Sequence, residues 1–194
     1  MLKAVNQFVQ HHHFADGTRY DRHAGKAFGR LHRRVATEVA SAAPEGATVL
    51  DAGCGSGRLA GELARRRPDL HVHGVDLERG MIEVATDRAA REKLTDRVDF
   101  AVADLADLPL PDGSVDFVVS TASLHHWTDV EGVIDSLARV LRPDGQLWIY
   151  DLRWVPVGRV RSASASRGRR VERTTVRTGR LPFAFFQRFE IAPA

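Results

Sequence analysis

The chain has 194 residues, of which 43% are hydrophobic and 27% charged, and a formal net charge of +3. This length suits one α/β domain and is short for two. A mean hydropathy of -0.25 and the lack of a long apolar run exclude a membrane span. Cys54 is the only cysteine, which excludes an internal disulfide or a cysteine-based zinc site.

The charge is unevenly distributed along the chain. Residues 1–152 have a net charge of -5, whereas residues 153–194 hold 10 Arg and 2 Glu. The basic segment fits either an acidic or nucleic-acid partner or a solvated, Arg-rich surface. The N-terminal sequence MLKAVNQFVQHHHF lacks the apolar stretch of a secretory signal, so we expect a cytoplasmic protein.

Apolar periodicity predicts a helix over residues 21–42, followed by alternating strands and helices. Five strands are predicted at Thr48–Asp51, His71–Asp76, Val98–Ala103, Val115–Ser120 and Gln146–Asp151. Helices are predicted at Gly57–Arg67, Arg79–Lys93 and Val130–Leu141, with Pro68 and Pro143 ending two of them. Residues 104–114 form a predicted loop. The alternation indicates parallel βαβ units with right-handed crossovers.

The pattern changes after residue 151. A weak helical pattern covers residues 157–166. Two strands are predicted after it, at Val171–Arg177 and Phe183–Ile191, joined by the turn TGRLP.

The segment VLDAGCGSGRLA, residues 49–60, is the most informative about function. A buried strand ends at Asp51, and glycines at 53, 55 and 57 allow a tight turn into the next helix. The amides of that turn and the start of the helix suit a carboxylate or phosphate. Residues 55–60 also fit the dinucleotide-binding pattern G-x-G-x-x-G/A. The glycines alone therefore do not exclude a dinucleotide cofactor. We interpret Cys54 as a small residue within the turn.

A second acid follows at the end of the next strand. Asp76 lies 25 positions after Asp51, where a carboxylate can accept hydrogen bonds from both hydroxyls of a ribose. Leu77 and Met81 are apolar and one helical turn apart, as the face of an adenine requires. Ordinary helix packing explains Met81 equally well.

Several segments together resemble class I S-adenosylmethionine-dependent methyltransferases. The string D-x-G-x-G-x-G resembles their motif I, and FAVADLADLPLPDGSVDFVVSTASLHHW, residues 100–127, resembles motif II and its approaches. LARVLRPDGQLWIYD, residues 137–151, resembles the next motif. YDRHAGKAF, Tyr20–Phe28, is similar to the N-terminal helix entry of the type 11 group, which includes ubiquinone and menaquinone methyltransferases. The resemblance covers about residues 20–152.

The resemblance implies an α/β fold: a Rossmann-like doubly wound sheet of seven strands in the order 3-2-1-4-5-7-6, with strand 7 antiparallel. It also implies a single methyltransferase domain over residues 1–194. That domain would comprise an N-terminal lid or helix (1–45), a cofactor-binding core (46–152) and a basic segment with the last two strands (153–194). S-adenosyl-L-methionine would lie across the carboxyl ends of the strands, at the topological switch point.

By the same resemblance, Asp104 accepts from the adenine amine, Leu105 covers the ring, and Ser120 lies at the mouth of the fourth strand. The expected cofactor-binding residues are Asp51, Gly53, Cys54, Gly55, Gly57, Asp76, Leu77, Met81, Asp104, Leu105, Ser120 and Tyr20. No metal site is expected.

Methyl transfer from a sulfonium is an in-line displacement that depends mainly on positioning. A general base is needed only where the acceptor must lose a proton. His125 and His126, which follow the fourth strand, are the candidates. Alternatively, one of them packs against Trp127 or caps the following helix.

Missing sequence features limit the classes of molecule that could accept the methyl group. We expect Cys54 to be buried in the glycine turn, which leaves no cysteine to attack C5 of a cytosine. After the fourth strand the chain reads STASLHHW instead of Asn/Asp-Pro-Pro-aromatic. We therefore expect a small-molecule acceptor with an O, N or C nucleophile. The alternatives are an RNA or polyanion methyltransferase that uses the Arg-rich segment, a non-catalytic cofactor-binding subunit, and a nicotinamide oxidoreductase.

Overall fold

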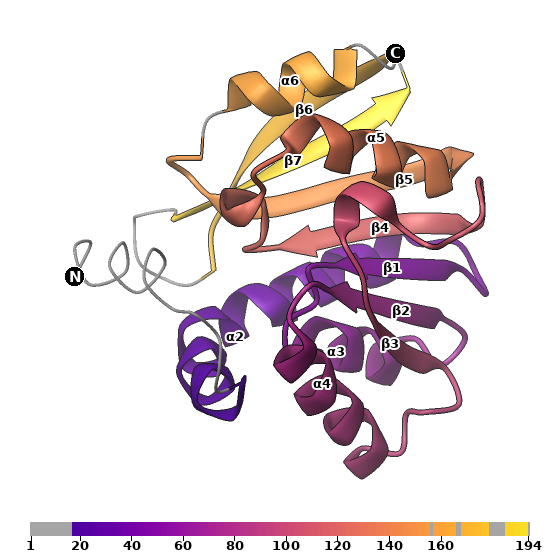
Figure 1. Cartoon of the computed structure of the whole chain (residues 1–194), viewed down its shortest axis with the longest axis vertical. Helices are drawn as coiled ribbons and strands as arrows, with labels where there is room; N and C mark the ends of the chain where they lie inside the picture. The colour runs from indigo at the N-terminus through magenta and orange to yellow at the C-terminus, as the bar shows by residue number, and fades with distance from the viewer. Residues whose placement is uncertain (1–16, 156, 166–167, 179–184, 194) are drawn as a thin grey trace.

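The computed structural model describes residues 17–155, 157–165, 168–178 and 185–193, with side chains described between residues 28 and 192 of these ranges. The chain forms a seven-stranded sheet in the order β3-β2-β1-β4-β5-β7-β6 (Figure 1). Strands β1 to β5 pair in parallel, and β7 is antiparallel to both β5 and β6. The predicted strand order and orientation are confirmed.

The strands are β1 (Thr48–Ala52), β2 (His71–Asp76), β3 (Val98–Val102), β4 (Val115–Thr121), β5 (Leu141–Leu152), β6 (Arg169–Val176) and β7 (Phe186–Pro193). The helices are α2 (Gly17–Ala42), α3 (Arg58–Arg66), α4 (Arg79–Arg91), α5 (Val130–Val140) and α6 (Val157–Ala165). Short 3-10 turns occupy Leu105–Asp107 and Leu124–His126. Of the helices described, none is long and apolar enough to cross a bilayer.

Helices cover both faces of the sheet, so its central strands are apolar on both sides. Val49 of β1 belongs to a core shared with α2 and α3, whereas its neighbour Leu50 belongs to a core shared with α5 and α6. The same alternation places Trp148 and Tyr150 of β5 on the α2 side. Because these two cores occupy the faces, the turns at the carboxyl ends of the strands remain available for a site.

Several boundaries differ from the predictions. Helix α2 begins four residues earlier than predicted, and the predicted loop after β3 contains a 3-10 turn. The prediction that Pro143 ends α5 is wrong, because α5 already ends at Val140 and β5 begins at Leu141. The pairing of β4 with β5 shifts register between Val115 and Phe117, and such an irregularity tolerates a proline in a strand. Most of the TGRLP turn lies outside the described residues.

Candidate active site

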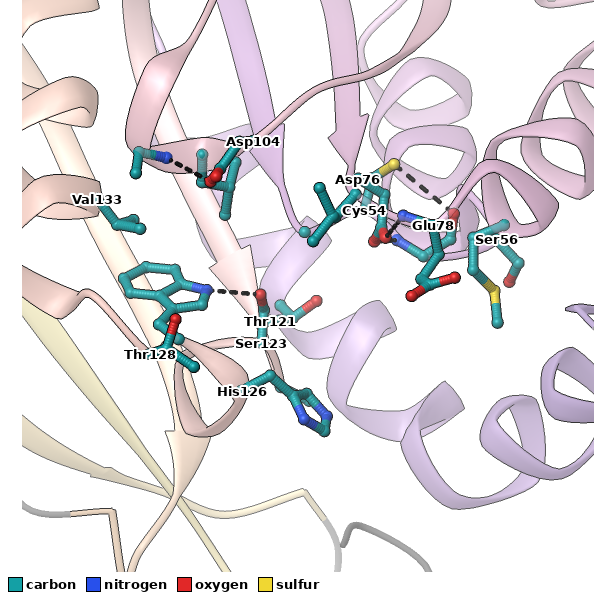
Figure 2. A pocket seen from close by; sticks show the side chains of 18 of the residues that line it. Cys54, Ser56, Asp76, Glu78, Asp104, Thr121, Ser123, His126, Thr128 and Val133 are labelled. Carbon is teal, nitrogen blue, oxygen red and sulfur yellow. Dashed lines mark hydrogen bonds between the residues drawn. The ribbon is translucent and has the colours of Figure 1, made fainter. Parts of the chain in front are cut away.

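A cavity of about 480 Å³ lies at the carboxyl ends of the parallel strands. Its walls come from α2, from the turns that follow β1, β2, β3 and β4, and from the first residues of α3, α4 and α5. Figure 2 shows Asp76, at the end of β2, and Asp104 and His126, which come after β3 and β4, around this cavity. The sheet order reverses between β1 and β4, and ligands of doubly wound sheets bind at that point. The cavity is therefore the candidate site.

The turn after β1 presents its backbone to the cavity. Gly53 and Gly57 have φ values of 73° and 72°, a region in which a side chain is strained. A Cβ at Gly53 would also lie 2.1 Å from Ser123 Oγ. The amides of Gly53 and Cys54 donate to the carbonyl of Val75 at 2.8 and 3.0 Å. These contacts fix the turn against β2.

Asp76 ends β2 and connects the glycine turn to the start of α4. Its Oδ2 accepts from the amide of Gly55 at 2.8 Å, and its Oδ1 accepts from the amide of Glu78 at 3.0 Å. Burial raises the pKa of this carboxyl, while the two amides act in the opposite direction. A carboxylate oxygen has a further lone pair, so Asp76 can still accept from a ligand hydroxyl.

Asp104 follows β3 and lines the same cavity. Its side chain accepts from the amide of Ala106 at 2.9 Å and caps the 3-10 turn that contains the buried Leu105. Leu77 and Met81 also line the cavity, but they differ in exposure: Leu77 is 66% exposed and Met81 only 2%. The cavity therefore combines two carboxylates from neighbouring strand ends with three apolar side chains.

Asp51 lies behind the glycine turn and does not line the cavity. It is fully buried, and among the described residues neither of its carboxyl oxygens has a hydrogen-bond partner. Burial, and secondarily the charge of Asp76, raise the pKa of Asp51 to about 7. Any effect of Asp51 on a ligand is therefore electrostatic, acting through the turn.

The two histidines have different positions. Nδ1 of His125 lies 2.8 Å from Oδ1 of the fully buried Asp151, and the His125 amide donates to the same carboxyl at 3.2 Å. His125 does not line the cavity, whereas His126 does (Figure 2). Their ring centroids are 4.0 Å apart. Asp151 thus orients His125, and His125 in turn packs against the histidine that faces the cavity.

His126 has an unusually low basicity for a histidine. Desolvation, and secondarily the neighbouring His125, lower the pKa of His126 to about 4. The ring is consequently neutral at pH 7, with one nitrogen able to accept a proton.

The structure also shows a contact that the sequence did not indicate. Nε1 of Trp127 donates to Ser123 Oγ at 2.9 Å, a bond drawn in Figure 2, and both residues line the cavity. The helix cap considered for a histidine is supplied by Asp129, whose side chain accepts from the amide of Gly132 at 2.9 Å. The tripeptide HHW therefore contributes one ring to the cavity wall from His126 and another from Trp127.

The expected cofactor residues divide into two groups by position. Those that line the cavity are Gly53, Cys54, Gly55, Asp76, Leu77, Met81, Asp104 and Leu105. Asp51, Gly57 and Ser120 are buried outside it. Burial raises the pKa of the Cys54 thiol, which makes it a poor nucleophile. The side chain of Tyr20 lies outside the described residues. Lining residues missed by the sequence analysis include Phe28, His32, Arg58 and Thr121.

Known proteins resemble this chain in sequence. A family model described as a methyltransferase domain matches residues 50–149, just over half of the chain. The 27-O-demethylrifamycin SV methyltransferase of Amycolatopsis mediterranei is 41% identical over 131 residues, which cover 68% of this chain and 48% of that protein. The demethylmenaquinone methyltransferase of Clavibacter sepedonicus is 38% identical over 128 residues, which cover 66% of this chain and 50% of that protein. The chain thus spans about half the length of these curated relatives.

Solved structures resemble it in fold. A SAM-dependent methyltransferase from Aquifex aeolicus superposes with a TM-score of 0.73 at 22% identity, covering 91% of this chain and 97% of the other. The [4+2]-cyclase SpnF superposes with a TM-score of 0.68 at 25% identity, covering 74% of this chain and 60% of the other. With the family match over residues 50–149 and the observed strand order, the chain belongs to the methyltransferase domain family of class I S-adenosylmethionine-dependent methyltransferases.

Proposed function

We propose that this protein transfers a methyl group from S-adenosylmethionine to a hydroxyl oxygen of a small-molecule acceptor, with His126 accepting the hydroxyl proton. The observation that carries the proposal is the arrangement of the cavity. A glycine turn and the acids Asp76 and Asp104 lie in the same pocket as a neutral, cavity-facing histidine.

The cavity fits the cofactor chemically. Asp76 would hold the ribose hydroxyls, and Asp104 would accept from the adenine amine between Leu77, Met81 and Leu105. The carboxylates that line the cavity also suit a ligand with a net positive charge. When bound, S-adenosylmethionine supplies a methyl group on a positively charged sulfur, which is open to displacement by an in-line nucleophile.

The residues after β4 would handle the proton. A hydroxyl must lose its proton as its oxygen takes up the methyl carbon, and a ring nitrogen of His126 would accept it. Asp151 fixes His125 through two hydrogen bonds, and His125 packs on the His126 ring. We infer that Asp151 and His125 act as positioning residues for His126. Phe28 and Trp127, which line the cavity, help to exclude water.

The names of the relatives support a small-molecule acceptor. The demethylrifamycin enzyme is named for methylation of an oxygen, as are two fungal O-methyltransferases that are 34% and 36% identical. The lid role expected for residues 1–45 and Tyr20 stays a prediction, as does the single-domain organisation of residues 1–194.

The fold alone does not determine the reaction, as the cyclase name of one structural neighbour illustrates. The first test is the melting temperature with S-adenosylmethionine, S-adenosylhomocysteine and NADH. We expect a gain with the first two compounds, and a gain with NADH alone would refute the cofactor. The second test is mass detection of methylated product from a panel of hydroxylated polyketides and quinols. Cofactor binding without turnover on any of them would favour a non-catalytic subunit.

A polyanionic acceptor is the second candidate, because arginines are exposed on the edge strand. Arg170 and Arg173 of β6 are both exposed, and among the strands that the structure describes β6 pairs with β7 alone. Retention of tRNA or rRNA at low salt that falls steeply with rising salt would support this candidate. Absence of retention at low salt would remove it.

A further inference from the structure

We propose that one end of the sheet, where β5 and β6 finish and β7 begins, binds the surface of an anionic lipid bilayer. Two exposed aromatic side chains and the arginines beside them would make the contact. The aromatic residues are Trp154, which follows β5, and Phe185, which precedes β7. This property goes beyond the proposed methyl transfer, and it can be measured without cofactor or acceptor.

Large apolar side chains are exposed at few places in the described part of the chain. Leu77 and Val102 lie at the ends of β2 and β3, whereas Trp154 and Phe185, which are 44% and 41% exposed, lie together. The amide of Arg153 donates to the carbonyl of Phe185 at 3.0 Å, which places Phe185 next to the residue that precedes Trp154. A single exposed apolar residue needs no explanation, but neighbouring ones with a polar rim mark an interaction surface.

Arginines flank the aromatic pair on both sides. Arg153 and Arg177 are exposed, and the first residue of β7 pairs with the residues that directly precede them. Phe185, one position earlier, therefore lies between these two arginines. The acidic residues of β6 and β7, Glu172 and Glu190, face each other four residue pairs further along. Since each arginine at an anionic bilayer improves partition about fivefold, this end of the sheet has the charge that such a surface attracts.

The aromatic pair lies at the same edge of the sheet as the cavity. β4 and β5 run in parallel, and β7 starts where β5 ends. Phe186, which follows Phe185, packs edge-on against Phe28 with ring centroids 6.0 Å apart, and Phe28 lines the cavity. Arg159, exposed on α6, donates to the carbonyl of the lining residue Thr128 at 3.1 Å. An apolar acceptor dissolved in a bilayer at this surface would thus be concentrated beside the cavity.

Two other occupants fit this surface less well. A second copy of the chain in a two-fold contact centred here would bring its own arginines against Arg153 and Arg177, and like charges repel. Single-stranded RNA would stack its bases on the aromatic rings. Val155 and Val157, which follow Trp154 and are half-buried, add aliphatic surface that offers no ring for stacking. A bilayer interface accepts aliphatic and aromatic side chains alike.

The experiment is sedimentation of the full chain with lipid vesicles. One preparation contains phosphatidylcholine and phosphatidylserine, and the other contains phosphatidylcholine alone. We expect binding to the mixed vesicles that weakens at high salt, and at least about tenfold weaker binding without phosphatidylserine. Trp154→Ala with Phe185→Ala should weaken binding to the mixed vesicles at least about tenfold, as should Arg153→Gln with Arg177→Gln. Trp154→Phe should still bind, but should lose most of the blue shift in tryptophan fluorescence that mixed vesicles cause in the wild type.

Arg170→Gln with Arg173→Gln is the matched control, because it removes two other exposed arginines of β6. These lie seven and four residues before Arg177, beyond the screening length at physiological salt, so vesicle binding should stay within about twofold of the wild type. The melting temperature and the affinity for S-adenosylhomocysteine should be unchanged in every variant. If the double aromatic variant does not fold, Trp154→Phe and the arginine variant still decide the matter.

Absence of binding to the mixed vesicles by the folded wild type would overturn the inference, as would unchanged binding in the aromatic or the arginine variant. Dimerisation or RNA retention that the same variants abolish, without vesicle binding, would assign the surface to that partner and would also overturn it. A wild type that binds vesicles but not S-adenosylhomocysteine would refute the proposed cofactor and leave the bilayer surface standing.

Discussion

Replacing Asp51 by asparagine should make the unliganded protein more stable at alkaline pH than the wild type. Asp51 is fully buried and has no hydrogen-bond partner among the described residues, and its pKa is raised from 3.8 to about 7. Between these values the folded state binds more protons than the unfolded state. The free energy of unfolding therefore falls as the pH rises through this range. Asparagine has a similar shape but no charge to bury.

The size of the effect follows from the shift. A pKa difference of about three units corresponds to about 4 kcal/mol at full ionisation, at roughly 1.4 kcal/mol per unit. About 2.5 kcal/mol of this falls between pH 5 and pH 8, since part of the penalty is already present at pH 5. Asp51→Asn should lack this portion of the decline in the free energy of unfolding.

The assay is urea unfolding at several pH values between 5 and 8, for the wild type and the variant without ligand. The difference between them isolates Asp51, because His126, whose lowered pKa makes stability rise with pH below about 6.5, titrates in both. Asp87→Asn, at an exposed position on α4, should follow the wild-type pH dependence. Parallel curves for Asp51→Asn and the wild type would refute the reasoning.

Further outcomes follow from the cavity. Asp76→Ala and Gly55→Val should each weaken the binding of S-adenosylhomocysteine at least about a hundredfold in a titration. The first variant removes the proposed acceptor for the ribose hydroxyls, and the second places a side chain on a residue with φ 52°. Unchanged affinity in either variant would contradict the proposed site. In the wild type, kcat/KM should fall only below about pH 5, because the pKa of His126 is about 4; a decline centred near pH 6.5 would contradict its role as base. Ser123→Ala and Trp127→Phe should raise the KM of the acceptor similarly, and the double variant no further; additive effects would show that their hydrogen bond is not the common cause.

Local sequence patterns predicted which segments form strands and that the first five run parallel. The order of the strands followed from the resemblance to class I methyltransferases. The central strands β1 and β4 are buried on both faces and are mostly apolar, whereas β2 and β3 also carry exposed polar residues. The proposed cofactor side of the cavity was also predictable, because Asp76 ends one strand and Asp104 comes shortly after the next, where the resemblance places an adenine contact. Carboxyl ends of parallel strands meet at one edge, so position along the chain translates into position in space.

The acceptor side was less predictable, because its contacts join residues that no local pattern connects. Asp151 lies in β5, yet its carboxyl orients His125, 26 residues earlier. The start of β5 was mispredicted for a related reason, since its pairing with β4 at Val115 overrides the turn preference of Pro143.

The contact between Gly53 and Ser123 constrains how this protein can be re-engineered. Ser123 occupies the space that a Cβ at Gly53 would need, so the proposed acceptor side of the cavity packs directly against the glycine turn. Enlarging residue 123 to broaden the acceptor range should therefore reduce cofactor affinity at the same time. Libraries aimed at new acceptors will do better at Phe28 or Thr128, which line the cavity but come from α2 and from the end of the loop before α5.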